Sequence, residues 1–417
     1  MSVGFSRRRL LGWTGAGAAV AGVGAVSGYT LGRSESDVAS PGTDVVDFRG
    51  TYQAGITTPS QNELYFTALD LTSTGKGAVQ RMLSQWTVAA ERMTRGLETA
   101  EGGALPQNRE SPPTDTGETL DLPPSSLTVT IGFGSTFFDK LGIADRRPAA
   151  LADLPAFPGD RLDPARSGGD ICIQACANDP QVAVHAVRNL IRIGFGTTAV
   201  RWGQFGYGRT SSTSTQQPTA RNLFGFKDGT HNLKAEEPDL LDEHVWVQGG
   251  DGPDWMTDGT YLVARRIRMH IETWDRASLD EQESVVGRTK GTGAPLGGIG
   301  EFDPANYRSI DANGTPVIPV DSHIRLASAE SLNGIKILRR GFNFVVGSDD
   351  NGHLNAGLFF ICFVRDPRTQ FVPMQQALAA RDAMREYIQH TGSALFACPP
   401  GLREGEYWGQ RLLEGDV

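Results

Sequence analysis

The strongest constraint on the fold is an order of strands and helices that occurs twice after residue 44. In the first half, segments that alternate apolar and polar residues predict strands, and segments with apolar residues at helical spacing predict helices. The proline that opens Pro180–Ile193 also favours the start of a helix. The predicted elements are strands at 63–72, 126–133, 170–177 and 199–207 and helices at 77–95 and 180–193. Their order is βαββαβ.

The second half repeats this order. Its predicted elements are strands at 260–271, 336–346, 354–364 and 394–398 and helices at 278–286 and 369–390. A βαββαβ unit is typical of the ferredoxin-like arrangement, in which helices cover one face of an antiparallel sheet. We therefore predict an α+β protein with two ferredoxin-like halves, 45–215 and 216–417. The length of 417 residues suits two domains.

The first 44 residues read as an export signal followed by a linker. Ser6-Arg7-Arg8-Arg9-Leu10-Leu11 precedes an apolar, glycine-rich stretch at 12–29, and this pattern resembles a twin-arginine signal peptide. An uncleaved membrane anchor is the alternative, although a stable span needs about 20 strongly apolar residues. We expect the twin-arginine machinery to export the protein to the periplasm or the extracellular space. Because that route carries folded proteins, a cofactor would be loaded before export.

Composition excludes several classes of partner. A net charge of -9 argues against nucleic acid and anionic membranes, because both require a basic surface. The four cysteines are too scattered for a disulfide framework and include no CxxC pair for zinc. We expect Cys172 and Cys176 to be packing residues near strand ends. Small molecules are the expected partners, and a homo-oligomer is left open.

The hexapeptide Gly225-Phe226-Lys227-Asp228-Gly229-Thr230 places a carboxylate between two glycines. Asp-Gly pairs are common in tight turns, and taken alone this one is better interpreted as an ordinary turn. The flanking glycines would nevertheless allow the backbone to pass close to a large flat ligand. Asp228 is therefore a candidate to face a cofactor.

His323 begins a short segment, His323-Ile324-Arg325-Leu326, whose alternation predicts an extended strand with His323 and Arg325 on one face. Such a histidine is more often a hydrogen-bonded core or surface residue than a ligand. The other six histidines show no metal-binding spacing, so a multi-histidine metal site is not supported. A haem iron needs only one axial histidine, because the porphyrin supplies the other four nitrogens.

Arg339 and Arg340 interrupt a segment, 335–346, that otherwise reads as a buried strand. Adjacent strand residues point to opposite faces, so one arginine must face inward or toward a pocket. A buried charge is costly unless it is paired with an anion, and a haem propionate, a peroxide or Asp228 would serve. The simpler alternative is that one arginine faces solvent and the other pairs with a neighbouring carboxylate.

In combination, these motifs resemble the dye-decolourising peroxidases. Gly225-Phe226-Lys227-Asp228-Gly229 matches the GxxDG signature of that family, and the resemblance covers essentially the whole chain after the linker. It extends to Tyr52-Gln53-Ala54-Gly55-Ile56, to His323-Ile324-Arg325-Leu326-Ala327 and to Leu338-Arg339-Arg340-Gly341-Phe342. The resemblance implies haem b in the C-terminal half and two ferredoxin-like halves that pack as a β-sandwich. The twin-arginine segment fits an exported branch.

The resemblance also implies roles for single residues. His323 resembles the proximal ligand of the iron, Asp228 the distal acid–base residue and Arg339 the distal arginine. Further haem contacts are implied for residues of the same motifs and of the strand 354–364, namely Gly229, Thr230, His231, Arg325, Ser328, Leu358 and Phe360. A carboxylate that orients the ring of His323 is expected as well, and Glu330 and Asp366 are the candidates.

The implied activity is that of a haem peroxidase, which uses hydrogen peroxide to oxidise dyes, phenols or other small reductants. Asp228 would move a proton between the peroxide oxygens, and Arg339 would stabilise the charge on the departing oxygen. Trp408 or Tyr407 could relay electrons from substrates too bulky to enter. Two alternatives stay open: a deferrochelatase-like protein that releases iron from haem, and a haem carrier without turnover.

Overall fold

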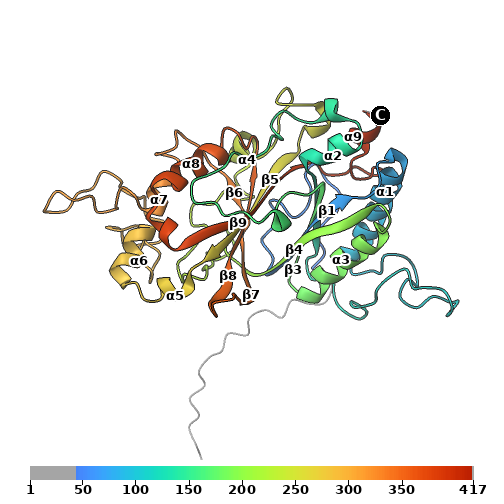
Figure 1. Ribbon diagram of the computed structural model, residues 1–417, viewed down its shortest axis with the longest axis horizontal. Helices are drawn as coiled ribbons and strands as arrows, with labels where there is room; N and C mark the ends of the chain where they lie inside the picture. Colours follow the sequence, from blue (N-terminus) through green and yellow to red (C-terminus); the bar gives the residue numbers. More distant parts are fainter. Residues whose placement is uncertain (1–43, 416–417) are drawn as a thin grey trace, which may run out of the picture. The chain divides into compact units, whose positions relative to one another are not determined.

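The computed structural model describes residues 44–415 of the chain (Figure 1). The segment predicted to be a twin-arginine signal, and nearly all of the predicted linker, lie outside the described residues. Among the helices within 44–415, none combines the length and the apolar character needed to cross a bilayer.

Nine strands of the described chain form one antiparallel sheet. They are β1 (Glu63–Leu71), β2 (Thr128–Phe133), β3 (Ile171–Ala177), β4 (Thr198–Arg209), β5 (Thr260–Met269), β6 (Leu338–Arg339), β7 (Phe342–Ser348), β8 (Leu354–Val364) and β9 (Ile388–Cys398). Their order is β5-β9-β2-β3-β1-β4-β7-β8-β6, and β5 also pairs with β8, which closes the sheet into a barrel. The α+β class is confirmed, but the strands form one closed sheet rather than the expected sandwich.

The helices pack on the outside of this sheet. They are α1 (Lys76–Met93), α2 (Ser135–Lys140), α3 (Pro180–Ile193), α4 (Pro238–His244), α5 (Ile271–Trp274), α6 (Leu279–Val286), α7 (His323–Leu326), α8 (Phe371–Arg381) and α9 (Gln410–Glu414), with 3-10 turns η1 (Ala144–Arg146), η2 (Pro164–Arg166), η3 (Asp254–Met256) and η4 (Ala383–Glu386). Figure 1 shows α1 and α3 at one end of the molecule and α5 to α8 at the other.

Three sequence predictions about elements of the second half were wrong. The helix predicted at 369–390 ends at Arg381, and β9 begins at Ile388 because ten of its residues pair with β5. The strand predicted at 336–346 is divided into β6 and β7. A Cβ on Gly341 would lie 2.8 Å from Thr210 Oγ1, so any larger residue at this bend would have to displace that side chain. His323–Leu326 forms the helical turn α7 instead of an extended segment.

Alternate residues of the strands form an apolar core inside the closed sheet. This core includes Leu64, Phe66, Cys172, Cys176, Leu262, Phe342, Phe359, Ile361, Phe396 and Cys398. Cys172 and Cys176 are free, buried packing residues of β3, as predicted. A second core lies outside the sheet, where α1 and α3 cover it. The intervening residues of β5 and β8 therefore face outward, where they are available to line a site.

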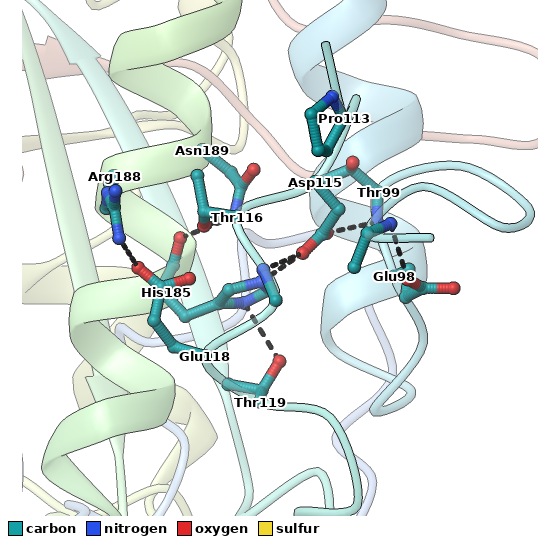
Figure 2. A network of polar contacts seen from close by, with 12 residues as sticks. Glu98, Thr99, Pro113, Asp115, Thr116, Glu118, Thr119, His185, Arg188 and Asn189 are labelled. Carbon is teal, nitrogen blue, oxygen red and sulfur yellow. Dashed lines mark hydrogen bonds and ion pairs between the residues drawn. The ribbon is translucent and has the colours of Figure 1, made fainter. Parts of the chain in front are cut away.

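A buried histidine–aspartate pair fastens the long connection between α1 and β2 to α3 (Figure 2). Nε2 of His185 lies 2.9 Å from Oδ1 of Asp115, and Nδ1 lies 3.2 Å from the hydroxyl of Thr119. Asp115 also accepts hydrogen bonds from the backbone N–H groups of Thr99 and Gly117. Burial raises the pKa of Asp115, but these hydrogen bonds outweigh burial and leave the pKa below its ordinary value. Both ring nitrogens of His185 are thus used within the fold.

Candidate active site

A cavity of about 730 Å³ lies against the outer face of β5 and β8. The paired residues Ile267 and Leu358 form part of this wall, and Phe360 continues it. Their neighbours Phe359 and Ile361 face the core inside the sheet, as strand alternation requires. The volume is within the range of about 300–1,000 Å³ that is usual for cofactor and ligand pockets. We call this space the active-site cavity.

An ion pair between Asp228 and Arg339 lies in the cavity wall. Nη1 of Arg339 donates a hydrogen bond of 2.6 Å to Oδ1 of Asp228, and both side chains are partly buried. The next residue, Gly229, has φ +86°, and a Cβ there would lie 3.1 Å from the backbone of Ser211. The turn that presents Asp228 therefore requires glycine at this position. Two residues separated by 111 positions in sequence meet at one point of the cavity.

The backbone of Arg339 is held by a side chain from the same turn that carries Asp228. Oδ1 of Asn232 accepts a hydrogen bond of 2.7 Å from the N–H of Arg339, and Nδ2 donates one of 2.8 Å to its carbonyl oxygen. Nδ2 also donates to the carbonyl of Ser212. Asn232 is buried, and this amide pairs with Arg339 as a neighbouring strand would. Sequence reasoning missed this residue; its position four residues after Asp228 was the available signal.

Arg340 lies on the opposite face and is fully buried. Its guanidinium donates to the backbone carbonyl of Thr58 at 2.5 Å and to the side chain of Gln61. Burial lowers the pKa of Arg340. One arginine faces a pocket, as the strand pattern predicted, but the other is buried inside the protein, where its two Nη groups are hydrogen-bonded and its Nε has no partner among the described residues.

His323 opens α7 and is oriented by Asp382, the residue that follows α8. Its Nδ1 lies 2.7 Å from Oδ2 of Asp382, whose Oδ1 accepts a hydrogen bond from the backbone N–H of Met384. Burial lowers the pKa of His323, but the charge and hydrogen bond of Asp382 outweigh burial and leave the pKa raised. The imidazole keeps 33% of its surface exposed and lines the cavity, with no hydrogen bond to Nε2 from the described residues.

Neither of the two carboxylates expected behind His323 occupies that position. Glu330 is at the cavity edge, where it lies 3.9 Å from Arg308. Asp366 follows β8 and pairs with Arg368. The carboxylate behind His323 is that of Asp382. It reaches the imidazole because α8 ends at the preceding residue and the chain then turns back toward α7. Asp382 lies in the segment 369–390, which was predicted as one continuous helix, so no sequence pattern singled it out.

The other sequence candidates separate into two groups. The residues that line the cavity together with Asp228, His323 and Arg339 are Gly229, Thr230, His231, Ser328, Leu358 and Phe360. Arg325 is not among the cavity-lining residues. Its guanidinium donates to the carbonyl of Ile318 at 2.8 Å and lies over the ring of Tyr307. In a helical turn, residues two positions apart do not share a face, which separates Arg325 from His323.

Another part of the cavity wall is formed by two cations, Arg288 and Lys336, with His231 beside them. Burial is the largest effect that lowers the pKa of His231, and the charges of Arg288, Arg339 and Lys336 lower it further. Burial likewise lowers the pKa of Arg288. An anionic group on a ligand would compensate the charges of Arg288 and Lys336, and the neutral ring of His231 adds a hydrogen-bond donor beside them, so we call these three residues the cationic wall.

The aromatic residues proposed as surface relays lie elsewhere. Trp408 is buried and packs edge-on against Phe48, with ring centroids 5.1 Å apart. Tyr407 bonds to Glu414 beside it, and both aromatic residues pack with the outer core rather than with the active-site cavity. The described residues also contain no group of three or more His, Cys, Asp or Glu side chains that could hold a metal ion alone.

Comparison with known protein families gives two adjacent matches. Residues 53–208 match the family described as Dyp-type peroxidase, N-terminal, and residues 219–403 match Dyp-type peroxidase, C-terminal. The chain is 38% identical to a dye-decolorizing peroxidase of Thermobifida fusca over 99% of this chain and 98% of that protein. It is 36% identical to a deferrochelatase of Escherichia coli K12, over 98% of this chain and 97% of that protein.

Solved structures give the same result. The structure of ferric DtpA from Streptomyces lividans is similar with a TM-score of 0.82 and 39% identity, over 91% of this chain and 100% of that chain. A DyP-type peroxidase from Cellulomonas bogoriensis is similar with a TM-score of 0.80 and 41% identity, over 90% and 100% of the two chains.

Proposed function

The chain belongs to the Dyp-type peroxidase family of haem-dependent enzymes, and from this premise we propose that Asp228, Arg339 and His323 carry its peroxidase reaction. One observation supports these roles above all. The three side chains line one cavity, and the charges of Asp228 and Arg339 are close enough to influence the pKa of His323. Since family membership makes the chain an enzyme, the non-enzymatic haem carrier is removed from the alternatives.

The residues of the active-site cavity fit a haem. The outward residues of β5 and β8 provide an apolar wall, which suits the flat porphyrin. The cationic wall suits its two propionates. His323 offers one nitrogen lone pair because Nδ1 is engaged by Asp382, which fixes the ring tautomer and increases the basicity of a ligand nitrogen. A single histidine is sufficient for an iron that the porphyrin already holds.

When bound, haem supplies an iron that takes up hydrogen peroxide and accepts electrons back from a reductant. The chain's own task is to move one proton and to stabilise one charge. The carboxylate of Asp228 would accept a proton from the peroxide oxygen nearer to the iron. It would then return this proton to the oxygen farther from the iron, which leaves as water. The guanidinium of Arg339 stabilises the negative charge that develops on the departing oxygen. The 2.6 Å ion pair holds both groups in place before peroxide arrives.

The test replaces each member of the pair and measures peroxide consumption by the haem-loaded enzyme. Asp228→Asn and Arg339→Leu should each lower the second-order rate constant by about 10²-fold or more, with haem absorbance retained. Asp349→Asn is the matched control, because it breaks a similar partly buried pair with Arg268 outside the cavity. An unchanged rate constant in either cavity variant would remove that residue from the mechanism.

A second candidate activity is the release of iron from haem. The observation that favours it is the extent of the match to the Escherichia coli deferrochelatase, which covers 97% of that protein. The two activities are separated by their products. Incubation of the haem-loaded protein with a reductant and an iron chelator would yield metal-free porphyrin if iron is removed, whereas peroxidase turnover leaves haem intact.

We also propose that the closed sheet consists of two ferredoxin-like halves, 45–215 and 216–417. The strand order supports this division, because the first and third strands of a βαββαβ unit are central in each half. They are β1 and β3 in one half and, when β6 and β7 are counted as the one strand that was predicted, β5 and β8 in the other. The halves meet at short seams, such as the single residue pair between β2 and β9. Separate expression of 216–417 tests the division, which would fail if this half alone could not bind haem.

We also propose that the protein is exported by the twin-arginine route. The pattern at Ser6-Arg7-Arg8-Arg9 supports this proposal. Mass spectrometry of the mature N-terminus is the direct measurement. A mature protein that still begins at residue 1 or 2 would contradict a cleaved signal.

A further inference from the structure

A second cavity, of about 550 Å³, lies where the end of α4, the start of β5 and the β8–α8 connection meet. We call it the side pocket. It is lined by Ala150, Glu243, His244, Asp251, Tyr261, Asn333, Gly334, Ile335, Arg365, Asp366, Arg368, Thr369 and Gln370. None of the roles proposed above uses this pocket.

Tyr261, the second residue of β5, presents an unsatisfied hydroxyl to the side pocket. The residue is only 2% exposed, yet its hydroxyl forms no hydrogen bond with any described residue and is not among the fully enclosed polar atoms. A buried tyrosine hydroxyl normally has a partner. Burial is the main effect that raises the pKa of Tyr261, and the charge of Asp366 adds to it, so the phenol remains protonated and can donate.

His244, the last residue of α4, is the second polar group without a partner. It is 8% exposed, and its ring forms no hydrogen bond with the described residues; the nearest acid, Glu243, is 3.7 Å away. Its backbone carbonyl accepts hydrogen bonds from Arg365 and Gln370, which fix its position. Burial is the main effect that lowers the pKa of His244, so the neutral ring offers one donor and one acceptor.

The charged residues of the side pocket largely neutralise one another. Nε and Nη2 of Arg365 both donate to the carboxylate of Asp251, at 2.6 and 2.9 Å. Arg368 binds Asp366 at 2.7 Å in the same way. Glu243 also lines the pocket, but its side chain is 67% exposed, so water solvates its charge. The buried polar groups left to recognise a ligand are the neutral phenol and the neutral imidazole. Ala150 and Ile335 add apolar surface. This combination suits a neutral aromatic molecule that carries a hydroxyl group.

The side pocket shares a wall with the active-site cavity. Ile335 lines both spaces, and the consecutive residues Gln370 and Phe371 line one each. A molecule in the side pocket is therefore separated from the active-site cavity by a single layer of side chains. We propose that the side pocket is a binding site for a small neutral phenol that serves as electron donor, with Tyr261 and His244 as its hydrogen-bond partners. The donor role rests on the proposed peroxidase function.

Binding is tested first on the resting holoenzyme, without peroxide. Calorimetric titration with 2-methoxyphenol should show one site, and 1,2-dimethoxybenzene, which lacks the hydroxyl, should bind at least about tenfold more weakly. Tyr261→Phe and His244→Phe should each weaken phenol binding about three- to tenfold, the effect of losing one hydrogen bond. Tyr207→Phe is the matched control, because Tyr207 is exposed and lines neither cavity. Equal affinities of the two compounds, or of wild type and Tyr261→Phe, would overturn the site.

Turnover then separates this site from the proposed function. In Tyr261→Phe the KM for 2-methoxyphenol should rise about three- to tenfold relative to the KM for hexacyanoferrate(II), an anion without a hydroxyl. If the wild type consumes no peroxide with either donor, the proposed function fails while the binding result stands. If peroxide is consumed normally and the ratio of the two KM values does not change, the donor site alone fails.

Discussion

Two histidine–aspartate pairs in this molecule have nearly the same contact and opposite uses. In His185–Asp115 the ring donates from Nε2 to the carboxylate, and its other nitrogen accepts from the hydroxyl of Thr119 (Figure 2). In His323–Asp382 the ring donates from Nδ1, and Nε2 has no partner among the described residues. The carboxylate selects opposite tautomers in the two pairs.

The difference shows what turns a common structural motif into a site. A carboxylate beside a histidine does not by itself indicate function, since His185 uses both nitrogens to hold a loop in place. His323 differs because the second nitrogen is left over and its ring lines a cavity. Counting the partners of both ring nitrogens thus separates the two cases.

The largest expected effect comes from removing the imidazole with the unused nitrogen. His323→Ala should abolish haem binding, because neither of the other histidines that line the cavity, His231 and His390, has a carboxylate hydrogen-bonded to its ring. His185→Ala should bind haem fully, since its ring is remote from the cavity lining. The ratio of haem absorbance to protein absorbance after reconstitution is the measurement. If His323→Ala still bound haem fully, the unused nitrogen of His323 would not distinguish it from His185 as an iron ligand.

The next effect concerns the two carboxylates. Asp382→Asn removes the negative charge that increases the basicity of His323, and we expect peroxidase activity or haem affinity to fall about 10- to 100-fold. Asp115→Asn changes the partner of His185 in the same way and should leave both properties unchanged. Haem transfer to an acceptor protein gives the affinities. Equal losses in the two variants would mean that both carboxylates act only through stability.

A smaller effect is expected on the free energy of unfolding. His185→Ala leaves the buried carboxylate of Asp115 without its side-chain partner and should destabilise the protein by about 2–4 kcal/mol. Denaturant unfolding monitored by far-UV circular dichroism would report this loss. A change below about 0.5 kcal/mol would mean that the network in Figure 2 contributes little.

The last effect develops only below about pH 6.5 and involves His390, which lines the cavity without a hydrogen-bonded acid; Asp160 is 3.7 Å away. Burial and the charge of Arg265 lower its pKa to about 3, against an ordinary value near 6.5. Its neutral state therefore stabilises the fold fully above about pH 6.5, and this contribution is lost as pH falls toward 3. His390→Leu should show a flatter decline of Tm between pH 7 and 4 than wild type. Parallel declines would contradict this, and His353→Leu, at an exposed position, is the control.

Asp228, Arg339 and His323 could be singled out because the short motifs around them resemble those of a known family, and the structure brings all three to one cavity, while their catalytic roles stay predictions. Asp382 and Asn232 could not be predicted in this way. Their roles depend on partners 59 and 107 positions away, which only the folded chain brings together. Arg325 shows the reverse error, since a period of two was assigned to a segment that forms a helical turn.

The fold, like the site, could be predicted where it depends on local sequence. Most strands and the helices α1 and α3 follow from local periodicity, and the α+β class follows from them. The start of β9 could not be predicted, because residues 388–390 continue a helix-like sequence and become a strand only by pairing with β5. Closure of the sheet depends on β5 pairing with β8 and on seams as short as Phe133 with Ala397. Nothing in the local sequence encodes such pairings.

The amide of Asn232 has a consequence for precision under thermal motion. Asp228 and Asn232 belong to one tight turn, and Asn232 holds the main chain of Arg339 from both sides. A drift of that turn carries the acid and the arginine in the same direction. The distance between the carboxylate of Asp228 and the guanidinium of Arg339 therefore stays nearly constant when the turn moves.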